Sequence, residues 1–334
     1  MSIPPSEYVS NVWKEGIFGQ ILNHDTILIV RLTCVNKDGR VVFVTGGAGS
    51  ICSAQTRALV HLGANACIIG RNQEKTKAAA SDIATARKGA KVIGIGGCDV
   101  RNAEDLIKAA ERCVEELGAI DFVIAGAAGN FVAPISGLTS NGFKTVMEID
   151  VLGTYNTVKA TIPYLIESAA RNKENKGGLT GGRIIYVSAT FHYTGMPMQA
   201  HVMAAKASVD SIMASVAIEY GPYGITSNVI APGGIQGTEG LGRLSSSQVD
   251  LKTAASSIPL GKFGLVKDIS DATVYLFSDA GNYVTGEVLV VDGADWRNRG
   301  TSVGLDAGMK YPDFLLKGEF SKHVKGGKKE KPKL

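Results

Sequence analysis

VVFVTGGAGSIC, residues 41–52, joins a run of large apolar side chains to a loop rich in glycine. The run Val41–Val44 shows no alternation with polar residues, which is typical of a strand buried on both faces of a parallel sheet. A helix is predicted to begin at about Ser50 and to end near Gly63. A glycine-rich turn between a strand and a helix presents backbone N–H groups to a phosphate. This stretch therefore predicts the first unit of a nucleotide-binding α/β fold.

The same alternation of short apolar runs and longer helical segments continues along the chain. Six further strands are predicted at residues 66–70, 91–100, 121–126, 182–188, 225–233 and 286–293. Helices are predicted after residue 70 to about 88, and at about 102–117, 142–170 and 202–220. Strands separated by helices in this way form a parallel sheet covered on both faces. We predict a single-domain, Rossmann-like, doubly wound α/β fold with a seven-stranded parallel sheet at 41–294, an N-terminal extension at 1–40 and a C-terminal extension at 295–334.

Composition and charge exclude several classes of partner. The chain has 334 residues and a formal net charge of +4, and residues 322–334 alone hold six lysines against Glu330. The remainder is near neutral, so no nucleic-acid partner is expected. Its five cysteines form no CxxC pair, which indicates free thiols in a reducing compartment and no metal site. No apolar run approaches the roughly 18 residues of a membrane helix, so no membrane span is expected.

Candidate contacts to a dinucleotide follow from the loop and from the end of the second strand. An acidic residue after that strand suits the ribose diol of NAD, whereas a basic residue suits the 2′-phosphate of NADP. Arg71 stands there, and Lys75 follows it. We therefore predict NADPH as the cofactor. The loop residues expected to contact it are Gly46, Gly47, Gly49, Ser50 and Ile51.

The loop resembles the TGxxxGxG motif of the short-chain dehydrogenases/reductases. Gly46 matches the first glycine, whereas Ser50 and Cys52 occupy the places of the second and third. The resemblance extends over about residues 41–294 and implies further cofactor contacts. These are Asp99 and Val100 after the third strand, Ala127 after the fourth, and Pro232 and Gly233 after the sixth.

The catalytic pattern departs from that of most members of this family. They carry a YxxxK pair, and here Lys206 is present but Val202 stands where the tyrosine is expected. Asp150 takes the place of the family's catalytic asparagine. An aspartate that faces a lysine beside a cofactor can hold a water as proton donor. We therefore predict Asp150 and Lys206 as the catalytic residues.

This Asp–Lys pair without tyrosine resembles the peroxisomal 2,4-dienoyl-CoA reductases. The segments GNFVAP (129–134), FKTVMEIDVLGTYN (143–156), SATFHYTGMPMQAHVMAAKASVD (188–210) and APGGIQGTEGLGRL (231–244) carry the resemblance. It implies NADPH-dependent reduction of a 2,4-dienoyl-CoA to a 3-enoyl-CoA in the β-oxidation of unsaturated fatty acids, by a homo-oligomer. The implied contacts to the fatty acyl-CoA are Asn130, Phe131, Ser188 and Gly237. The mitochondrial branch uses a tyrosine upstream of its lysine, and Tyr193 is the alternative donor near that place.

The chain ends in Pro332-Lys333-Leu334. This resembles the SKL-type address that a peroxisomal import receptor reads, so a peroxisomal location is expected. Two other functions stay open from the sequence. One is a trans-2-enoyl-CoA reductase of the same fold, although those enzymes keep the tyrosine that Val202 replaces. The other is a non-catalytic NADPH-binding protein, which the departures at Ser50, Cys52 and Val202 would also fit.

Overall fold

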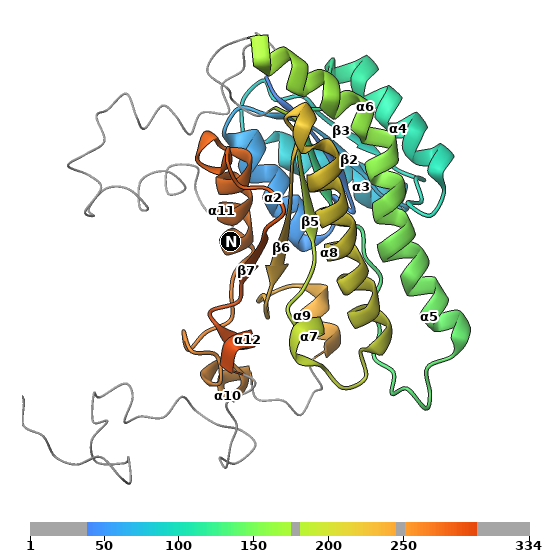
Figure 1. The fold of residues 1–334 in the computed structure, drawn as a ribbon, viewed down its shortest axis with the longest axis vertical. Helices are drawn as coiled ribbons and strands as arrows, with labels where there is room; N and C mark the ends of the chain where they lie inside the picture. Colours follow the sequence, from blue (N-terminus) through green and yellow to red (C-terminus); the bar gives the residue numbers. More distant parts are fainter. Residues whose placement is uncertain (1–38, 175–180, 245–250, 299–334) are drawn as a thin grey trace, which may run out of the picture.

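The computed structural model describes residues 39–174, 181–244 and 251–298. Within them, seven parallel strands form one sheet in the order β3-β2-β1-β4-β5-β6-β7 (Figure 1). The strands are β1 (Val41–Thr45), β2 (Asn65–Ile69), β3 (Val92–Ile95), β4 (Phe122–Ala125), β5 (Arg183–Val187), β6 (Thr226–Pro232) and β7 (Val288–Val291). The predicted single-domain Rossmann-like fold and its seven strands are confirmed.

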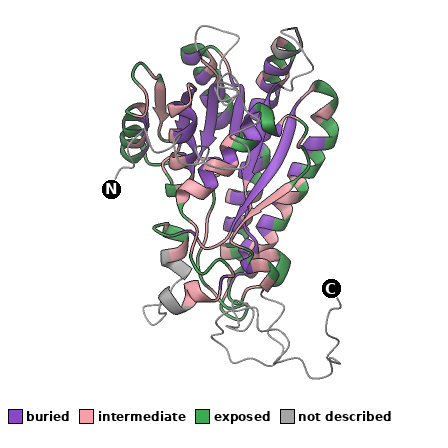
Figure 2. Cartoon of the chain, turned by 90° about the vertical axis from the view of Figure 1, so that its left-hand side faces the viewer, coloured by how far each residue is buried: buried purple, intermediate pink, exposed green. Residues whose placement is uncertain are grey.

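Alternate side chains of each central strand enter the core on opposite faces of the sheet. Val41 and Phe43 of β1 pack in one apolar cluster and Val42 and Val44 in another. The first cluster is completed by α4 (Ala103–Leu117), α6 (Gly153–Glu174) and α8 (Ala200–Tyr220), and the second by α2 (Ser50–His61), α3 (Gln73–Ala84) and α11 (Val266–Phe277). The central strands are therefore buried on both faces (Figure 2).

The strand order places a crevice where β1 and β4 lie side by side. The connections from these two strands run to opposite faces of the sheet, and ligands of doubly wound folds bind at this point. Thr45, the last residue of β1, ties the two strand ends together. Its Oγ1 accepts hydrogen bonds from the backbone N–H groups of Gly126 at 3.1 Å and Ala127 at 3.3 Å.

Two elements differ from the sequence prediction. The helix predicted over 142–170 is divided into α5 (Ser140–Val146), a π-helical turn η2 (Met147–Leu152) and α6. Helix α11 was not predicted at all. The remaining short helices are α7 (Phe191–Thr194), α9 (Glu239–Leu244), α10 (Leu251–Ser256), α12 (Asp295–Asn298) and the 3-10 turns η3 (Gly221–Tyr223) and η4 (Asp279–Gly281).

The proposed boundaries at residues 40 and 294 stay a prediction. Most of both extensions, including the lysine-rich end and residues 332–334, lies outside the described residues. Within the described ranges, no helix has both the length and the apolar character needed to cross a membrane.

Candidate functional site

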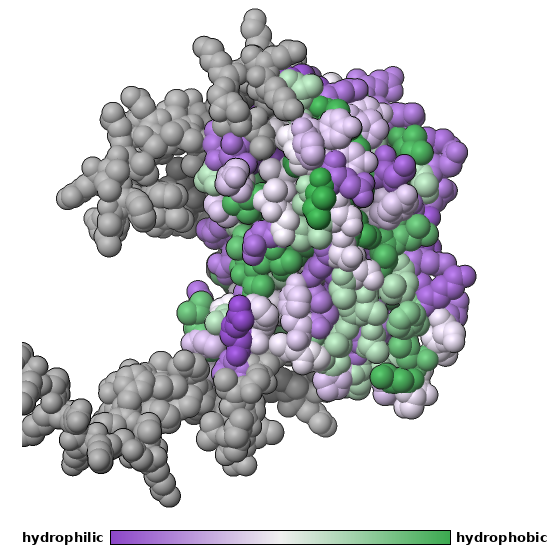
Figure 3. Space-filling model, in the orientation of Figure 1, coloured by the Kyte–Doolittle hydropathy of each residue, from purple (hydrophilic) through white to green (hydrophobic). Residues whose placement is uncertain are grey.

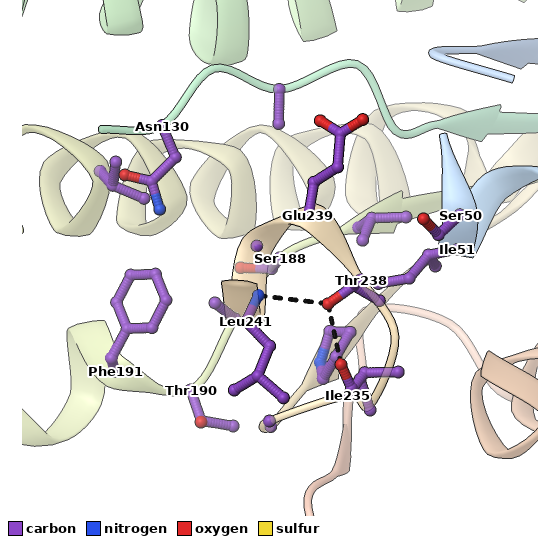
Figure 4. A pocket seen from close by; sticks show the side chains of 18 of the residues that line it. Ser50, Ile51, Asn130, Ser188, Thr190, Phe191, Ile235, Thr238, Glu239 and Leu241 are labelled. Atoms are coloured by element: carbon purple, nitrogen blue, oxygen red, sulfur yellow. Dashed lines mark hydrogen bonds between the residues drawn. The ribbon is translucent and has the colours of Figure 1, made fainter. Parts of the chain in front are cut away.

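A cavity of about 520 Å³ opens at the carboxyl ends of the strands. This volume lies in the range of small-molecule sites. The predicted site residues that line it are Gly46, Gly49, Ser50, Ile51, Asn130, Asp150, Ser188, Lys206, Pro232 and Gly233. Those outside its lining are Gly47, Arg71, Asp99, Val100, Ala127, Phe131 and Gly237. Figure 4 shows Asn130, Thr190 and Phe191 toward one end of the cavity and Ser50 and Ile51 toward the other.

The loop after β1 needs glycine for two separate reasons. Gly46 has a φ of +67°, and a Cβ there would lie 2.9 Å from the Cα of Ala127. A Cβ on Gly47 would lie 2.5 Å from the Cβ of Ile68. The loop ends at Gly49, the N-cap of α2, which provides no side-chain hydrogen bond to the first turn. The N–H groups of that turn are therefore available to a phosphate, as in other helix N-terminal anion sites.

Cys52 occupies the place of the family's third glycine and is accommodated by a glycine elsewhere. A Cβ on Gly126 would lie only 2.2 Å from the Cys52 Sγ. The space that the thiol needs is thus provided at the end of β4. Burial raises the pKa of the Cys52 thiol to about 12, although the positive charge of Lys206 opposes this. The thiol is neutral at physiological pH and acts as a packing group.

Asp150 and Lys206 meet at the floor of the cavity. The Lys206 Nζ lies 3.1 Å from the Asp150 Oδ2, and both side chains are buried. The other carboxylate oxygen, Oδ1, accepts a hydrogen bond from the Gly129 N–H at 2.6 Å. Lys206 also donates to the Val187 carbonyl at the end of β5, at 3.0 Å. Each charged group is therefore held from two sides.

The π-helical turn η2 carries Asp150 and packs against α8, the helix of Lys206. Such turns insert one residue into a helix and are frequent at functional sites. Beyond its ion pair with the Lys206 Nζ, the Asp150 Oδ2 has no hydrogen bond to a described residue, and neither does the buried Ser188 Oγ. Buried polar atoms of this kind normally bind a water or ligand. The floor of the cavity can therefore hold a water that contacts the paired carboxylate and ammonium.

The predicted contacts of the adenosine end lie along the β2 and β3 side. Arg71 is exposed and forms no ion pair within the described part of the chain. Asp99, in contrast, already forms an ion pair, because its carboxylate accepts a hydrogen bond from the Arg101 guanidinium at 2.6 Å. This contact lowers the pKa of Asp99. Val100 is buried and its carbonyl accepts from the Asn156 side chain at 3.0 Å.

Tyr193 does not reach the cavity. Its hydroxyl donates to the Asp210 carboxylate, which also binds the His192 ring at 2.7 Å, and its ring packs on Trp296. Burial and the Asp210 hydrogen bond both raise the pKa of Tyr193. The described geometry thus disfavours Tyr193 as the alternative proton donor. Its neighbour Phe191 does line the cavity.

Sequence reasoning predicted one wall of the cavity only in part. Thr238 donates to the Ile235 carbonyl at 2.8 Å and accepts from the Leu241 N–H at 3.2 Å, which forms the turn beside Gly237 (Figure 4). Glu239 in this turn pairs with Lys75 of α3 at 3.4 Å. Unpredicted lining residues that follow this turn in the chain include Ala254, Ser257, Ile258, Phe263 and Asp295. They carry no motif, although the GTEG segment (237–240) already indicated a loop beside the substrate.

Comparisons with known proteins agree with this geometry. A family model described as enoyl-(acyl carrier protein) reductase matches residues 46–293. The chain is 50% identical over 285 residues to the peroxisomal 2,4-dienoyl-CoA reductase of Saccharomyces cerevisiae, covering 85% of this chain and 92% of the yeast protein. It is 38% identical to the peroxisomal 2,4-dienoyl-CoA reductase of Danio rerio, covering 77% and 81% of the two chains. A short-chain dehydrogenase structure from Bacillus anthracis is similar with a TM-score of 0.66 and 33% identity, over 77% of this chain and 96% of that one.

Proposed function

The chain belongs to the peroxisomal 2,4-dienoyl-CoA reductases of the short-chain dehydrogenase/reductase family, and we propose that Asp150 and Lys206 direct its reaction. It is an oxidoreductase that reduces a 2,4-dienoyl-CoA to a 3-enoyl-CoA. The observation that carries the assignment of catalytic residues is the buried pair of Asp150 and Lys206, 3.1 Å apart in the cavity floor. The position of the usual tyrosine is taken by the buried Val202.

The residues of the cavity fit a nicotinamide dinucleotide. The pyrophosphate would lie on the loop at Gly46, where the Ala127 backbone leaves no room for a Cβ, and on the first turn of α2. Arg71 would bind the 2′-phosphate, which makes NADPH the proposed cofactor. Lys206 would hold the nicotinamide ribose, beside Pro232 and Gly233. When bound, NADPH supplies the hydride that adds to the δ carbon of the dienoyl thioester.

The protein groups then stabilise and protonate the resulting anion. Its negative charge is delocalised onto the thioester oxygen, where the Asn130 side chain and nearby backbone N–H groups would donate hydrogen bonds. A water bound to the Asp150–Lys206 pair would give a proton to the α carbon. The Asp150 Oδ2 has only its ion pair with Lys206, and the Ser188 Oγ has no hydrogen bond among the described residues, so both support this water site. The product keeps a double bond at carbon 3.

The test is a turnover assay with the purified protein. NADPH oxidation should depend on a 2,4-dienoyl-CoA, and mass spectrometry with NMR should identify a 3-enoyl-CoA product. Oxidation with a 2-enoyl-CoA in place of the dienoyl-CoA would favour the trans-2-enoyl-CoA reductase. NADPH binding by fluorescence, with no turnover of either thioester, would favour a non-catalytic protein.

A homo-oligomer is also part of the proposal. The exposed side of α8 carries Ala207, Ser211, Ala214 and Ile218, with no exposed charged side chain between residues 207 and 218. Ile218 is 79% exposed in the single chain. Figure 3 shows side chains coloured toward hydrophobic gathered over α8 on this face. An apolar helix face of this kind is typical of a subunit interface.

The enzyme is peroxisomal, as its relatives in yeast and zebrafish are named. We propose that the import receptor recognises Pro332-Lys333-Leu334, which lies outside the described residues. Removing these three residues from a fluorescent fusion should leave it in the cytosol.

A further inference from the structure

Gln199 is a buried side chain that the proposed mechanism does not use. It stands immediately before α8, the helix that carries Lys206, and is only 1% exposed. Its Nε2 donates to the Phe131 carbonyl at 3.1 Å and to the Met198 carbonyl at 3.0 Å. One amide group thus joins the start of α8 to the loop that follows β4.

A second contact and a rare backbone conformation reinforce this junction. The Ala133 N–H donates to the Met198 carbonyl at 3.1 Å. Met198 itself has a φ of +63°, a conformation that is unfavourable for a residue with a side chain. The segment before α8 is therefore held in an uncommon geometry that directs the Met198 carbonyl toward the Gln199 amide and the Ala133 N–H.

The loop bound by Gln199 is the one that orients the catalytic carboxylate. Gly129 donates its N–H to the Asp150 Oδ1 at 2.6 Å. Asn130 lines the cavity. The ring of Phe131 stacks on the buried ring of His201, with centroids 4.3 Å apart. Phe131 is therefore held by its carbonyl and by its ring, two residues away from the N–H that binds Asp150.

We propose that Gln199 is a positioning residue for proton transfer. By holding the Phe131 carbonyl, it fixes the Gly129 N–H and with it the Asp150 carboxylate relative to Lys206. The same helix start thus sets the position of both catalytic groups. This inference rests on the proposed roles of Asp150 and Lys206 in the reduction.

The hydrogen bonds of the Gln199 amide show which of its two polar groups is used. The Gln199 Oε1 is buried without a hydrogen bond among the described residues, so the side chain acts through its N–H donor. Gln199→Met keeps the length and the approximate volume but removes that donor. Since a displacement of about 1 Å can cost about 100-fold in rate, kcat should fall by about 10- to 100-fold. NADPH affinity should stay within about twofold, because no contact of Gln199 reaches the glycine loop.

Gln55 offers a matched control. It is equally buried, its Nε2 donates to the Thr273 Oγ1 at 2.8 Å, and its Oε1 also lacks a hydrogen bond within the described residues. It joins α2 to α11 on the other face of the sheet. Gln55→Met should lower the melting temperature as Gln199→Met does, yet leave kcat unchanged.

Two further readouts separate positioning from a general loss of structure. The solvent deuterium isotope effect on kcat should rise in Gln199→Met, because proton transfer becomes slower than the other steps. Amide hydrogen exchange at Gly129 should accelerate in Gln199→Met and not in Gln55→Met. This exchange needs no turnover, so the contact is tested even if the wild type fails to reduce a dienoyl-CoA. Unchanged exchange at Gly129, or equal loss of kcat in both variants, would overturn the proposal.

Discussion

Val202 stands four residues before Lys206 and is almost completely buried. A valine has no proton to transfer, so at this position the family's usual donor is replaced by packing against Val146 and Ala205. Asp150, Ser188 and Lys206 are among the buried residues with polar or thiol side chains that line the cavity, together with Cys52, Thr190 and Asp295. In the proposed mechanism, protonation therefore shifts from the tyrosine hydroxyl to a water held by the charged pair of Asp150 and Lys206.

Asp150→Asn tests this shift directly. The amide keeps the shape of the carboxylate but not its charge, so the paired Lys206 would no longer share a water with an anion. Turnover of a 2,4-dienoyl-CoA should fall by about 10²–10⁴-fold, the usual contribution of an acid–base group. NADPH affinity, measured by fluorescence titration, should be nearly unchanged. The control is Glu148→Gln. Glu148 lies on the same π-helical turn but pairs with Lys144 at the surface, so this variant should retain full activity. Near-native turnover in both Asp150→Asn and Asp150→Ala would place the proton donor elsewhere.

Arg71→Ala tests the cofactor assignment. Arg71 is exposed beyond the end of β2 and free of ion pairs among the described residues, so its guanidinium is available to a 2′-phosphate. Loss of a charge-assisted hydrogen bond costs about 1.5–3 kcal/mol, and NADPH affinity should fall by the corresponding factor. NADH affinity should not change, because that cofactor lacks the phosphate. Calorimetric titration measures the affinity for both cofactors. An unchanged ratio of NADPH affinity to NADH affinity would contradict the assignment.

At the scale of elements, the contact between α2 and β4 shows how a departure from the family motif is tolerated. The Cys52 side chain on α2 fills the space that the missing Cβ of Gly126 leaves at the end of β4. Gly126→Ala should destabilise the protein by about 1–3 kcal/mol, the usual cost of overpacking. Adding Cys52→Ala should recover most of that loss, because it removes the Sγ that clashes. Denaturant unfolding of the two single variants and the double variant measures the coupling. If the losses of unfolding free energy in the two single variants add up in the double variant, the two residues do not compete for this space.

The sheet was predictable because most of its strands contain a continuous apolar run, such as VVFV in β1 and IIYV in β5, near glycine or polar residues. Helix α11 was not predicted, because Val266–Phe277 contains several β-branched residues that favour strands. Its apolar residues nevertheless follow helical spacing, and the Asp268 carboxylate accepts the Leu265 N–H at 2.7 Å at its start. Those two signals could have identified it. The π-helical turn had no such signal, since nothing in MEIDVL (147–152) distinguishes an inserted residue from a regular helix.

The candidate site was predictable where chemistry limits the choice of residue. Asp150 is an unusual residue in a recognisable place, Lys206 is the family's usual lysine, and the two meet as expected from the motif. Gln199 has no comparable signal. Its role depends on a contact with Phe131, 68 residues earlier in the chain, which only the fold brings together.

At the scale of the whole molecule, the apolar side of α8 predicts an assembly. Ala214→Arg would place a charge in the proposed interface and should lower the mass measured by size-exclusion chromatography with light scattering. The control is Ala78→Arg, which changes an exposed alanine of α3 on the other face of the sheet. This variant should leave the mass unchanged. An equal mass for the wild type and both variants would contradict the proposed interface.

The stability of the whole fold should also depend on His201 in mildly acidic solution. Burial lowers the pKa of His201 below its ordinary value of 6.5, although the Phe131 carbonyl and the Asp150 charge oppose this. The unfolded chain therefore binds a proton at a higher pH than the folded chain does, and the free energy of unfolding must decrease as the pH falls below about 6.5. The decrease ends once the pH is below the pKa of His201 in the folded state, where both states are protonated.

His201→Phe keeps a ring against Phe131 and cannot titrate, so its unfolding free energy should decrease less over this interval. Urea unfolding of both proteins between about pH 8 and pH 5 measures the difference. Parallel curves for the two proteins would mean that His201 has the same proton affinity in the folded and unfolded states.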